Sequence, residues 1–268
     1  MSSLMSSVII TGAALAAAAA LTQAAVQVKS IAYKDGQTEM EGYLAYDDEV
    51  KGAQPLVLVV HEWWGLNDYA KSRARQLAQL GYVAFAVDMY GKGVLAKDAK
   101  TAGTLAGKLR SDRPAMRQRI LAGLDAVKSD PRVDPKRIAA IGYCFGGTTV
   151  LELARSGANI AGVVSFHGGL DTSKPAEANG IKCKVLALSG ADDRSVPPAQ
   201  IAAFEDEMRQ AKADYQIVLY GRAVHAFTNP ASGNDPSTNV AYNAAADRRS
   251  WQAMRDFFTE IFTPATKQ

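Results

Sequence analysis

The stretch Ile138 to Gly147, IAAIGYCFGG, decides the fold of this chain. Its four leading apolar residues are enough for a buried strand, Gly-x-Cys-x-Gly-Gly follows, and residues 148–155 can form a helix. This order predicts a strand, a sharp turn and a helix with Cys144 at the apex, as in a nucleophile elbow. The apex of such an elbow is strained, and a Cβ on either side would clash with the neighbouring strand and helix, so the flanking glycines are expected.

Cys144 would lie at the N-terminus of the helix, where the backbone dipoles favour its thiolate. The backbone N–H of Phe145 would point to where an oxyanion forms. The alternative is a small buried apolar residue in a Gly-rich turn, which is the commoner fate of a lone cysteine. Cys183, the second of two cysteines, begins another predicted strand. A bridge between them would destroy the nucleophile, so we expect none.

Apolar runs on both sides of this stretch indicate an α/β protein. Strands are expected over 32–33 and 42–46 around a hairpin turn at Asp35-Gly36, then over 55–60, 83–87, 138–141, 160–166, 184–189 and 215–220. Helices are expected over 69–80, 97–109, 114–128, 148–155, 198–212 and 242–262. Two antiparallel strands followed by this alternation predict about eight mostly parallel strands with helices on both faces, in a single domain spanning 26–268.

Composition excludes several classes of function. The net charge of +3 comes from basic residues interleaved with acidic ones, which argues against nucleic acid as a partner. A cluster of Arg110, Arg113, Arg117 and Arg119 reads as a solvated basic face, with an arginine that reaches an anionic substrate group as the alternative. No zinc-ligand spacing or phosphate-binding Gly-rich loop occurs, so no metal or cofactor is implied.

The first 25 residues carry no charged side chain and contain an Ala-rich apolar run, Val8 to Leu21. They resemble a secretory signal peptide with cleavage near Ala24 or Ala25, although no Lys or Arg precedes the run. We therefore expect a periplasmic or secreted protein, and otherwise a cytoplasmic one. A membrane anchor is disfavoured because alanine contributes little transfer energy, so no stable membrane insertion is expected. A cloning extension before Met5 would also explain the start.

A cysteine nucleophile needs a base, and the base needs an orienting carboxylate. Cys144, Asp193 and His225 follow separate predicted strands in the order nucleophile, acid, histidine. Asp192 competes for the acid role, and the Val196-Pro197 turn that follows favours Asp193. The other two histidines, His61 and His167, also end strands but stand in the wrong order. We interpret them as pocket-lining or structural.

Four motifs, in this order and spacing, resemble the dienelactone hydrolase family, a cysteine-nucleophile branch of the α/β-hydrolases. They are His-Glu-Trp-Trp-Gly-Leu-Asn from His61, Asp-Met-Tyr-Gly from Asp88, Gly-Tyr-Cys-Phe-Gly-Gly from Gly142 and Val-His-Ala-Phe from Val224. The resemblance runs from about Val28 to Phe262 and implies the α/β-hydrolase fold.

The resemblance also implies residue roles. Cys144, Asp193 and His225 would form the triad, and Glu62 would hold the resting thiol and help to generate the thiolate. The backbone N–H groups of Trp63 and Phe145 would form the oxyanion hole. One departure concerns the fourth position after the histidine. Enzymes that act on dienelactone carry there an arginine for the substrate carboxylate, whereas this chain has Asn229, which argues against dienelactone as the physiological substrate.

The expected activity is hydrolysis of a small-molecule carboxylic ester or lactone through an acyl-cysteine intermediate. Trp63, Trp64, Tyr90 and Tyr143 predict an aromatic pocket suited to neutral aryl or lactone esters. Some members of the dienelactone hydrolase family also hydrolyse phosphate triesters, so the resemblance implies this reaction as a side activity. A ligand-binding protein or a thiol redox protein on the same fold is the alternative. The oligomeric state is not indicated by the sequence.

Overall fold

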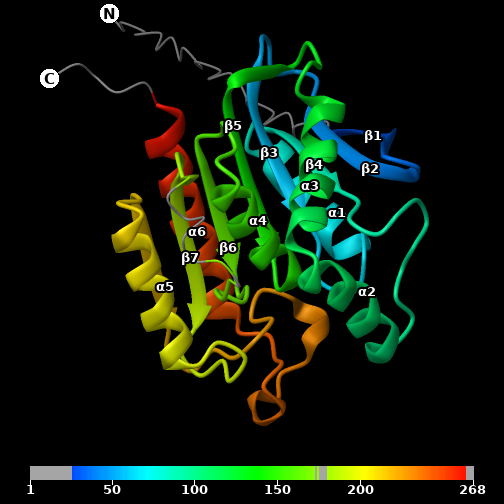
Figure 1. Cartoon of the computed structure of the whole chain (residues 1–268). Helices are drawn as coiled ribbons and strands as arrows, with labels where there is room; N and C mark the ends of the chain where they lie inside the picture. The colour runs from blue at the N-terminus through cyan, green and yellow to red at the C-terminus, as the bar shows by residue number, and fades with distance from the viewer. Residues whose placement is uncertain (1–25, 173, 175–179, 264–268) are drawn as a thin grey trace, which may run out of the picture.

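An eight-stranded sheet forms the centre of the molecule (Figure 1). The computed structural model describes residues 26–172, 174 and 180–263, so the leader expected over 1–25 lies outside the described residues. The strands are β1 (Val26–Asp35), β2 (Thr38–Asp47), β3 (Gln54–Val60), β4 (Val83–Val87), β5 (Val133–Tyr143), β6 (Gly162–Phe166), β7 (Lys184–Gly190) and β8 (Tyr215–Tyr220).

The strands lie side by side in the order β1-β2-β4-β3-β5-β6-β7-β8. The hairpin strand β2 pairs antiparallel with both β1 and β4, and every other pairing among the described strands is parallel. This arrangement confirms the expected mostly parallel α/β sheet. Because crossovers between parallel strands return each strand in the same direction, the carboxyl ends of β3 to β8 meet at one edge of the sheet.

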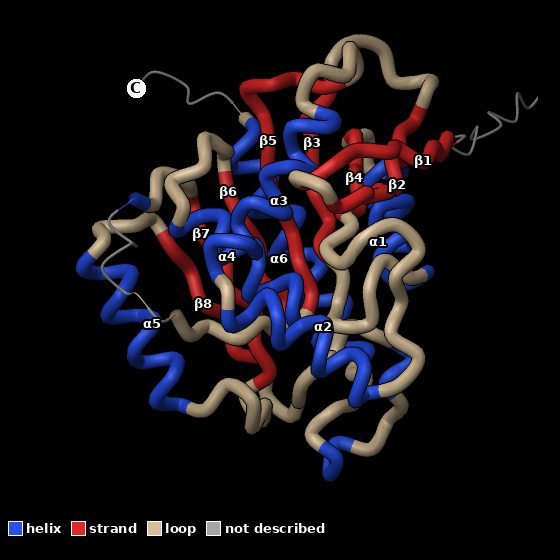
Figure 2. The backbone as a smooth tube through the Cα atoms, turned by 45° about the vertical axis from the view of Figure 1, so that its right-hand side comes forward, coloured by secondary structure: helices blue, strands red, loops and turns tan. Residues whose placement is uncertain are grey.

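Helices cover both faces of the sheet, as the turned view in Figure 2 shows. The helices are α1 (Asp68–Gln79), α2 (Ala99–Ser111), α3 (Arg113–Val127), α4 (Phe145–Arg155), α5 (Pro198–Gln210) and α6 (Ala244–Phe262). Apolar side chains of α3, α4 and α5 belong to one buried core, and those of α1 and α6 belong to the other. Successive residues of β3 alternate between the two cores, with Leu58 in the first and Val57 and Val59 in the second. Both faces of this strand are therefore buried, which explains its continuous apolar run.

Three strands are several residues longer than expected. The hairpin strands, expected over 32–33 and 42–46, span Val26–Asp35 and Thr38–Asp47. The third is β5. It begins at Val133, five residues before the expected start. Its N-terminal end pairs with Gln54 of β3, and the register of the two strands shifts between Pro55 and Leu56. Charged residues in this part, such as Lys136, hide a strand from a search for apolar runs. Two single-turn helices, η2 (Pro230–Ser232) and η3 (Pro236–Thr238), follow β8.

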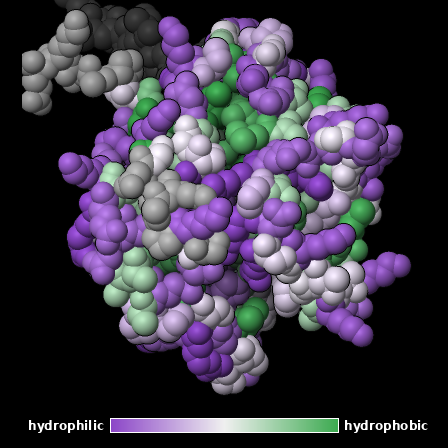
Figure 3. All heavy atoms as spheres, viewed as in Figure 1, coloured by the Kyte–Doolittle hydropathy of each residue, from purple (hydrophilic) through white to green (hydrophobic). Residues whose placement is uncertain are grey.

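Hydrophilic side chains cover most of the face shown in Figure 3. Among the described residues, no helix is both long and apolar enough to cross a bilayer.

Candidate active site

The elbow at Cys144 is built by β5, which ends at Tyr143, and α4, which begins at Phe145. Cys144 itself has a φ of 52°, in the region that L residues rarely adopt. A Cβ on Gly142 would lie 2.0 Å from the carbonyl oxygen of Gly146, and one on Gly146 would lie 2.3 Å from that of Val60. Backbone therefore packs directly on backbone here, which is why the turn needs glycines on both sides of the cysteine.

The strained backbone of Cys144 is held by two acceptors. Its N–H lies 3.0 Å from the carbonyl oxygen of Phe166 and 3.1 Å from Nδ1 of His167. The thiol is free, as is that of Cys183, so the structure agrees with the expected absence of a bridge between them. Burial raises the pKa of the Cys183 thiol to about 11, so this cysteine has the character of an inert core residue.

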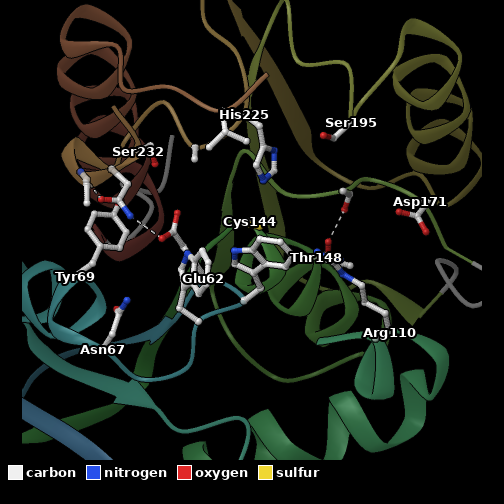
Figure 4. A pocket seen from close by; sticks show the side chains of 18 of the residues that line it. Glu62, Asn67, Tyr69, Arg110, Cys144, Thr148, Asp171, Ser195, His225 and Ser232 are labelled. Atoms are coloured by element: carbon white, nitrogen blue, oxygen red, sulfur yellow. Dashed lines mark hydrogen bonds between the residues drawn. The ribbon is translucent and has the colours of Figure 1, made fainter. Parts of the chain in front are cut away.

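His225 faces Cys144 from the loop after β8 (Figure 4). Its Nδ1 lies 2.8 Å from Oδ2 of Asp193. Burial disfavours the charged imidazole, but the charge and hydrogen bonding of Cys144 and Asp193 outweigh it and raise the pKa of His225 to about 10. The geometry therefore brings together a thiol, an imidazole and a carboxylate in the arrangement of a nucleophile, a base and an orienting acid.

Asp193, and not its neighbour, supplies this carboxylate. Asp193 is buried, whereas the Asp192 side chain is exposed. The backbone N–H of Ser195 donates to Oδ1 of Asp193 over 2.8 Å. Burial would raise the pKa of Asp193, but the bond to His225, the charge on that ring and the bonds from Ser195 hold it below the usual range. The carboxyl group is thus kept ionised beside the imidazole.

Glu62 is a buried carboxylate at the end of β3, and its recorded partner is Asn229. Nδ2 of Asn229 donates to Oε2 of Glu62 over 2.7 Å. Burial raises the pKa of Glu62, although this bond and the positive charges of His225 and Arg73 oppose the shift. The expected bond between Glu62 and the Cys144 thiol is not among the hydrogen bonds of the described residues. In this state the Asn229 amide holds the carboxylate instead.

A cleft of about 1260 Å³ opens above Cys144. It lies at the carboxyl ends of the strands, where open α/β sheets bind ligands. In Figure 4, Tyr69, Asn67 and Ser232 lie on one side of Cys144 and His225, and Arg110, Thr148 and Asp171 lie on the other. Its walls are formed by Glu62, Trp63, Trp64, Asn67, Asp68, Tyr69, Gly107, Arg110, Ser111, Arg113, Cys144, Thr148, Gly169, Asp171, Ser195, His225, Ala226, Asn229, Ala231, Ser232 and Val240.

Two of the aromatic residues expected in the cleft lie elsewhere. Tyr143 is fully buried on the opposite face of the sheet, where its ring stacks on Phe166. Side chains alternate along a strand, so the residue before the apex turns away from the cysteine. Tyr90 packs against Phe145 behind the cleft, and its hydroxyl donates to the carbonyl oxygen of Trp63 over 3.0 Å. Trp63, Trp64 and Asn229 do line the cleft.

The expected oxyanion donors come from the first turn of α4 and from the loop after β3. The amide N–H groups of Phe145 and Trp63 make no hydrogen bond to another described residue. The first turn of α4 follows Cys144 directly. The loop after β3 lies beside that turn, because Gly146 in α4 packs on the carbonyl group of Val60 at the end of β3. Free N–H groups in this position are what an oxyanion requires.

The remaining histidines are buried and neutral. Nδ1 of His61 bonds to the carbonyl oxygen of Glu62, and its Nε2 accepts from the N–H of Met89 over 3.3 Å. Burial lowers the pKa of His61 to about 4. His61 therefore fixes the loop after β3, in agreement with a structural reading. His167 lies beneath the elbow, bonded to Cys144.

The expected solvated basic face is wrong for three of its four arginines. Arg117 pairs with the buried carboxylate of Glu152 over 2.7 Å, and Arg119 pairs with Asp35 over 2.5 Å. Arg113 bonds to Asp171 over 3.0 Å at the wall of the cleft. Arg110 is exposed but lies over the ring of Phe145 and also borders the cleft. Their acidic partners come from distant segments, which a local charge pattern does not reveal.

Sequence reasoning missed several residues around the site. Tyr69 and Thr148 line the cleft from α1 and α4. Asn239, in the loop after η3, accepts the His225 N–H on its carbonyl oxygen and the Arg194 N–H on its side chain. Asn239 thereby joins the loop that carries His225 to the loop that carries Asp193. Its φ of 68° suits asparagine, but nothing in the local sequence announces its partners. Among the described residues, no group of His, Cys, Asp and Glu could hold a metal ion.

Comparisons with known proteins show which family this chain resembles. Residues 40–262 match the model of the dienelactone hydrolase family. A Yersinia pestis protein that carries the provisional name carboxymethylenebutenolidase is 30% identical over 233 residues, which are 83% of this chain and 84% of that protein. A crystal structure of a dienelactone hydrolase-like promiscuous phosphotriesterase from metagenomic libraries is 41% identical with a TM-score of 0.83. The match covers 88% of this chain and 98% of that one.

More distant structures share only the fold. An acylaminoacyl peptidase of Pyrococcus horikoshii is 15% identical with a TM-score of 0.70, and the match covers 91% of this chain and 43% of the peptidase chain. The sheet and its helices thus form the α/β-hydrolase fold that the sequence motifs implied.

Proposed function

The chain belongs to the dienelactone hydrolase family, and we propose that it hydrolyses carboxylic ester or lactone bonds through Cys144, His225 and Asp193. The observation that carries the proposal is the arrangement of the three side chains. The imidazole faces the thiol on one side and bonds to Asp193 over 2.8 Å on the other. An imidazole with a pKa of about 10 keeps its proton at neutral pH, ready for a leaving group.

In the proposed reaction, the Cys144 sulfur attacks the carbonyl carbon, and the π electrons move to the oxygen. The N–H groups of Trp63 and Phe145 stabilise that oxyanion. When the oxyanion collapses, the bond to the alcohol oxygen breaks, and His225 gives this oxygen its proton. His225 then removes a proton from water, which attacks the acyl-cysteine and releases the acid and the thiolate. Neither the triad nor the oxyanion donors need a metal or organic cofactor for these steps.

The test is hydrolysis of a p-nitrophenyl ester by wild type, Cys144→Ala and Cys183→Ala. Loss of the nucleophile should lower kcat by about 10³-fold or more, whereas the buried Cys183 should be dispensable. Rapid quenching followed by intact mass should detect an acyl group on wild type but not on Cys144→Ala. Equal rates in wild type and Cys144→Ala would remove the hydrolase proposal. Reaction of Cys144 with peroxide without any ester hydrolysis would favour the redox alternative.

A second activity, hydrolysis of aryl phosphate triesters, is supported by the 41% identity to the promiscuous phosphotriesterase. An oxyanion hole that accepts a tetrahedral carbon also has room for a phosphoryl oxygen. The test is release of p-nitrophenol from diethyl p-nitrophenyl phosphate. Release beyond one equivalent supports turnover, while a single equivalent with a persistent mass on Cys144 indicates that water does not resolve the adduct.

Export to the periplasm is also proposed, on the sequence of residues 1–25 alone. Mass analysis of the protein recovered from a periplasmic fraction should show a start near Ala25 or Val26. Recovery of the full-length chain in the cytoplasm would exclude it.

A further inference from the structure

His167 is a fully buried histidine that the proposed reaction does not use. It follows the last residue of β6, and its φ of 41° turns the side chain beneath the elbow. Its ring packs edge to face against the rings of His225 and Phe227, with centroids 5.3 Å and 5.2 Å away. His167 thus lies between the nucleophile and the base without facing the cleft.

Both ring nitrogens of His167 have partners, and together they fix its tautomer. Nδ1 must accept, because its partner is the backbone N–H of Cys144 at 3.1 Å. Nε2 therefore carries the hydrogen and donates to Oγ1 of Thr228 over 2.7 Å. The same Thr228 oxygen lies 2.6 Å from the hydroxyl of Tyr69. One imidazole thus links the elbow to a residue three positions after His225.

Thr228 is anchored from more than one direction. Its carbonyl oxygen accepts a 2.7 Å bond from Arg73, which also bonds to Asp247 over 2.6 Å. Arg73 belongs to α1 and Asp247 to α6, so the loop of the base is fastened to both helices on this face. The connection from Cys144 through His167 to Thr228 is therefore part of a rigid buried network.

The environment keeps His167 neutral. Burial, followed by the positive charges of His225 and Arg73, holds the pKa of His167 well below its usual value. Protonation would place an N–H against the N–H of Cys144 and remove one of the two acceptors that hold the strained cysteine. The ring can therefore serve as an acceptor at every pH where the enzyme would work.

We propose that His167 is a positioning residue, which sets the separation of the Cys144 sulfur and the His225 imidazole by holding both segments through its two ring nitrogens. The inference rests on the proposed roles of Cys144 and His225. It predicts that disturbing either bond of His167 displaces the reacting groups more than it harms the binding of substrate. A displacement of about 1 Å in such a site can cost about 100-fold in rate.

Two substitutions separate the two bonds. The amide of His167→Gln can reach Thr228 but leaves the Cys144 N–H without its ring acceptor, whereas the oxygen of His167→Asn lies near the position of Nδ1. We expect kcat for a p-nitrophenyl ester to fall about 10- to 100-fold in His167→Gln with KM changed less than about threefold, and to recover partly in His167→Asn. Thr228→Val removes the second bond at constant shape and should also lower kcat, while Thr228→Ser should retain it.

Ser250→Ala is the control, because it removes a buried hydroxyl whose one hydrogen bond to a described residue goes to the carbonyl oxygen of Asp247, within α6. It should lower thermal stability without altering kcat. The second readout is the rate of alkylation of Cys144 by iodoacetamide, followed by peptide mass. This rate depends on the imidazole beside the sulfur and should fall about tenfold in His167→Gln.

The alkylation assay needs no ester hydrolysis, so it tests His167 even if wild type cleaves no ester. Wild-type alkylation rates and wild-type kcat in folded His167→Gln and Thr228→Val proteins would overturn the inference, because His167 would then only fill space. A fall in melting temperature with an unchanged alkylation rate would lead to the same conclusion. Should His167→Gln fail to fold, the Thr228→Val and Thr228→Ser pair decides the question.

Discussion

Asn229 donates a 2.7 Å hydrogen bond to Glu62, and this bond joins the loop that carries His225 to the end of β3. A buried carboxylate is costly unless such donors stabilise it. The asparagine also caps η2 by accepting the N–H of Ala231 on its Oδ1. Asn229, four residues after His225, therefore holds a neighbouring side chain and a neighbouring turn in place.

Asn229→Ala should destabilise the protein in a pH-dependent way. Loss of the donor leaves the buried Glu62 carboxylate short of a partner and should cost about 1–3 kcal/mol in the free energy of unfolding. Burial already raises the pKa of Glu62 above 4.5, so its ionised form is the unfavourable one in the folded state. The part of the cost that comes from Glu62 is thus absent below that ordinary value and grows as the pH rises through the folded-state pKa, whereas loss of the η2 cap costs the same at every pH.

Urea unfolding of Asn229→Ala between pH 4 and pH 9 measures this cost. The matched background is Glu62→Gln, in which the same asparagine substitution should cost less and show no pH dependence. A cost that is equal at all pH values in both backgrounds would contradict the assigned coupling.

NMR titration should separate the three histidines. We expect His225 to stay protonated to about pH 10, His61 to stay neutral down to about pH 4, and His167 to stay neutral through the whole working range. Cys144 is the first of the groups that raise the pKa of His225, so Cys144→Ala should lower that pKa. Cys183→Ala should leave it unchanged, and a titration of His225 near its ordinary value of 6.5 in wild type would refute the proposed pairing.

Asp193→Asn and Asp192→Asn form a matched pair. Loss of the charge that bonds to His225 should lower kcat by up to about 10⁴-fold, because a neutral amide does not stabilise the imidazolium and can present an N–H where the ring needs an acceptor. Asp192 is exposed and should tolerate the same change. Ester hydrolysis measures both. The reverse outcome would assign the acid role to Asp192.

Tyr90→Phe and Tyr33→Phe test the support of the loop after β3, which carries the proposed oxyanion donor Trp63. Each hydroxyl donates over 3.0 Å to a backbone carbonyl, that of Trp63 for Tyr90 and that of Asp88 for Tyr33. Each loss should cost about 1 kcal/mol in unfolding free energy. Only Tyr90→Phe should lower kcat, by several-fold, because only that bond holds the Trp63 peptide. Equal kcat values in both variants would mean that the loop holds its shape without Tyr90.

The buried ion network that links α4 to α5 should contribute most to stability among the charged pairs. Arg155 bonds to Glu207 over 2.7 Å and to Glu152 over 3.0 Å, and all three side chains are almost fully buried. Arg155→Met leaves two buried carboxylates with one partner fewer and should cost about 3–5 kcal/mol. Arg209→Met, which breaks exposed pairs in α5, should have no measurable effect in the same urea titration.

The centre of the sheet could be predicted because β3, β4 and the second half of β5 carry continuous apolar runs. The elbow could be predicted because glycines on both sides of Cys144 indicate a turn that is too tight for a Cβ at those positions. The segments expected to carry the triad do meet at one edge of the sheet, and their catalytic roles remain predictions. Tyr143 was misplaced because a motif names the residues around an apex without saying which face each side chain takes.

Contacts between distant loops could not be predicted. Glu62 and Asn229 meet only because β3 and the loop after β8 end at the same edge of the sheet. Similarly, Arg117 and Glu152 carry no local sign that each neutralises the other. Such pairs depend on tertiary packing, which no single stretch of sequence encodes.

The backbone contacts at the elbow leave no space for a methyl group on Gly142 or Gly146, so these two positions should accept no other residue. The rim of the cleft is different. At Gly107 an added side chain would meet open space, and the wall there is formed by a surface helix. Directed evolution toward new substrates should therefore draw its libraries from this rim and leave the bend beneath the sulfur untouched.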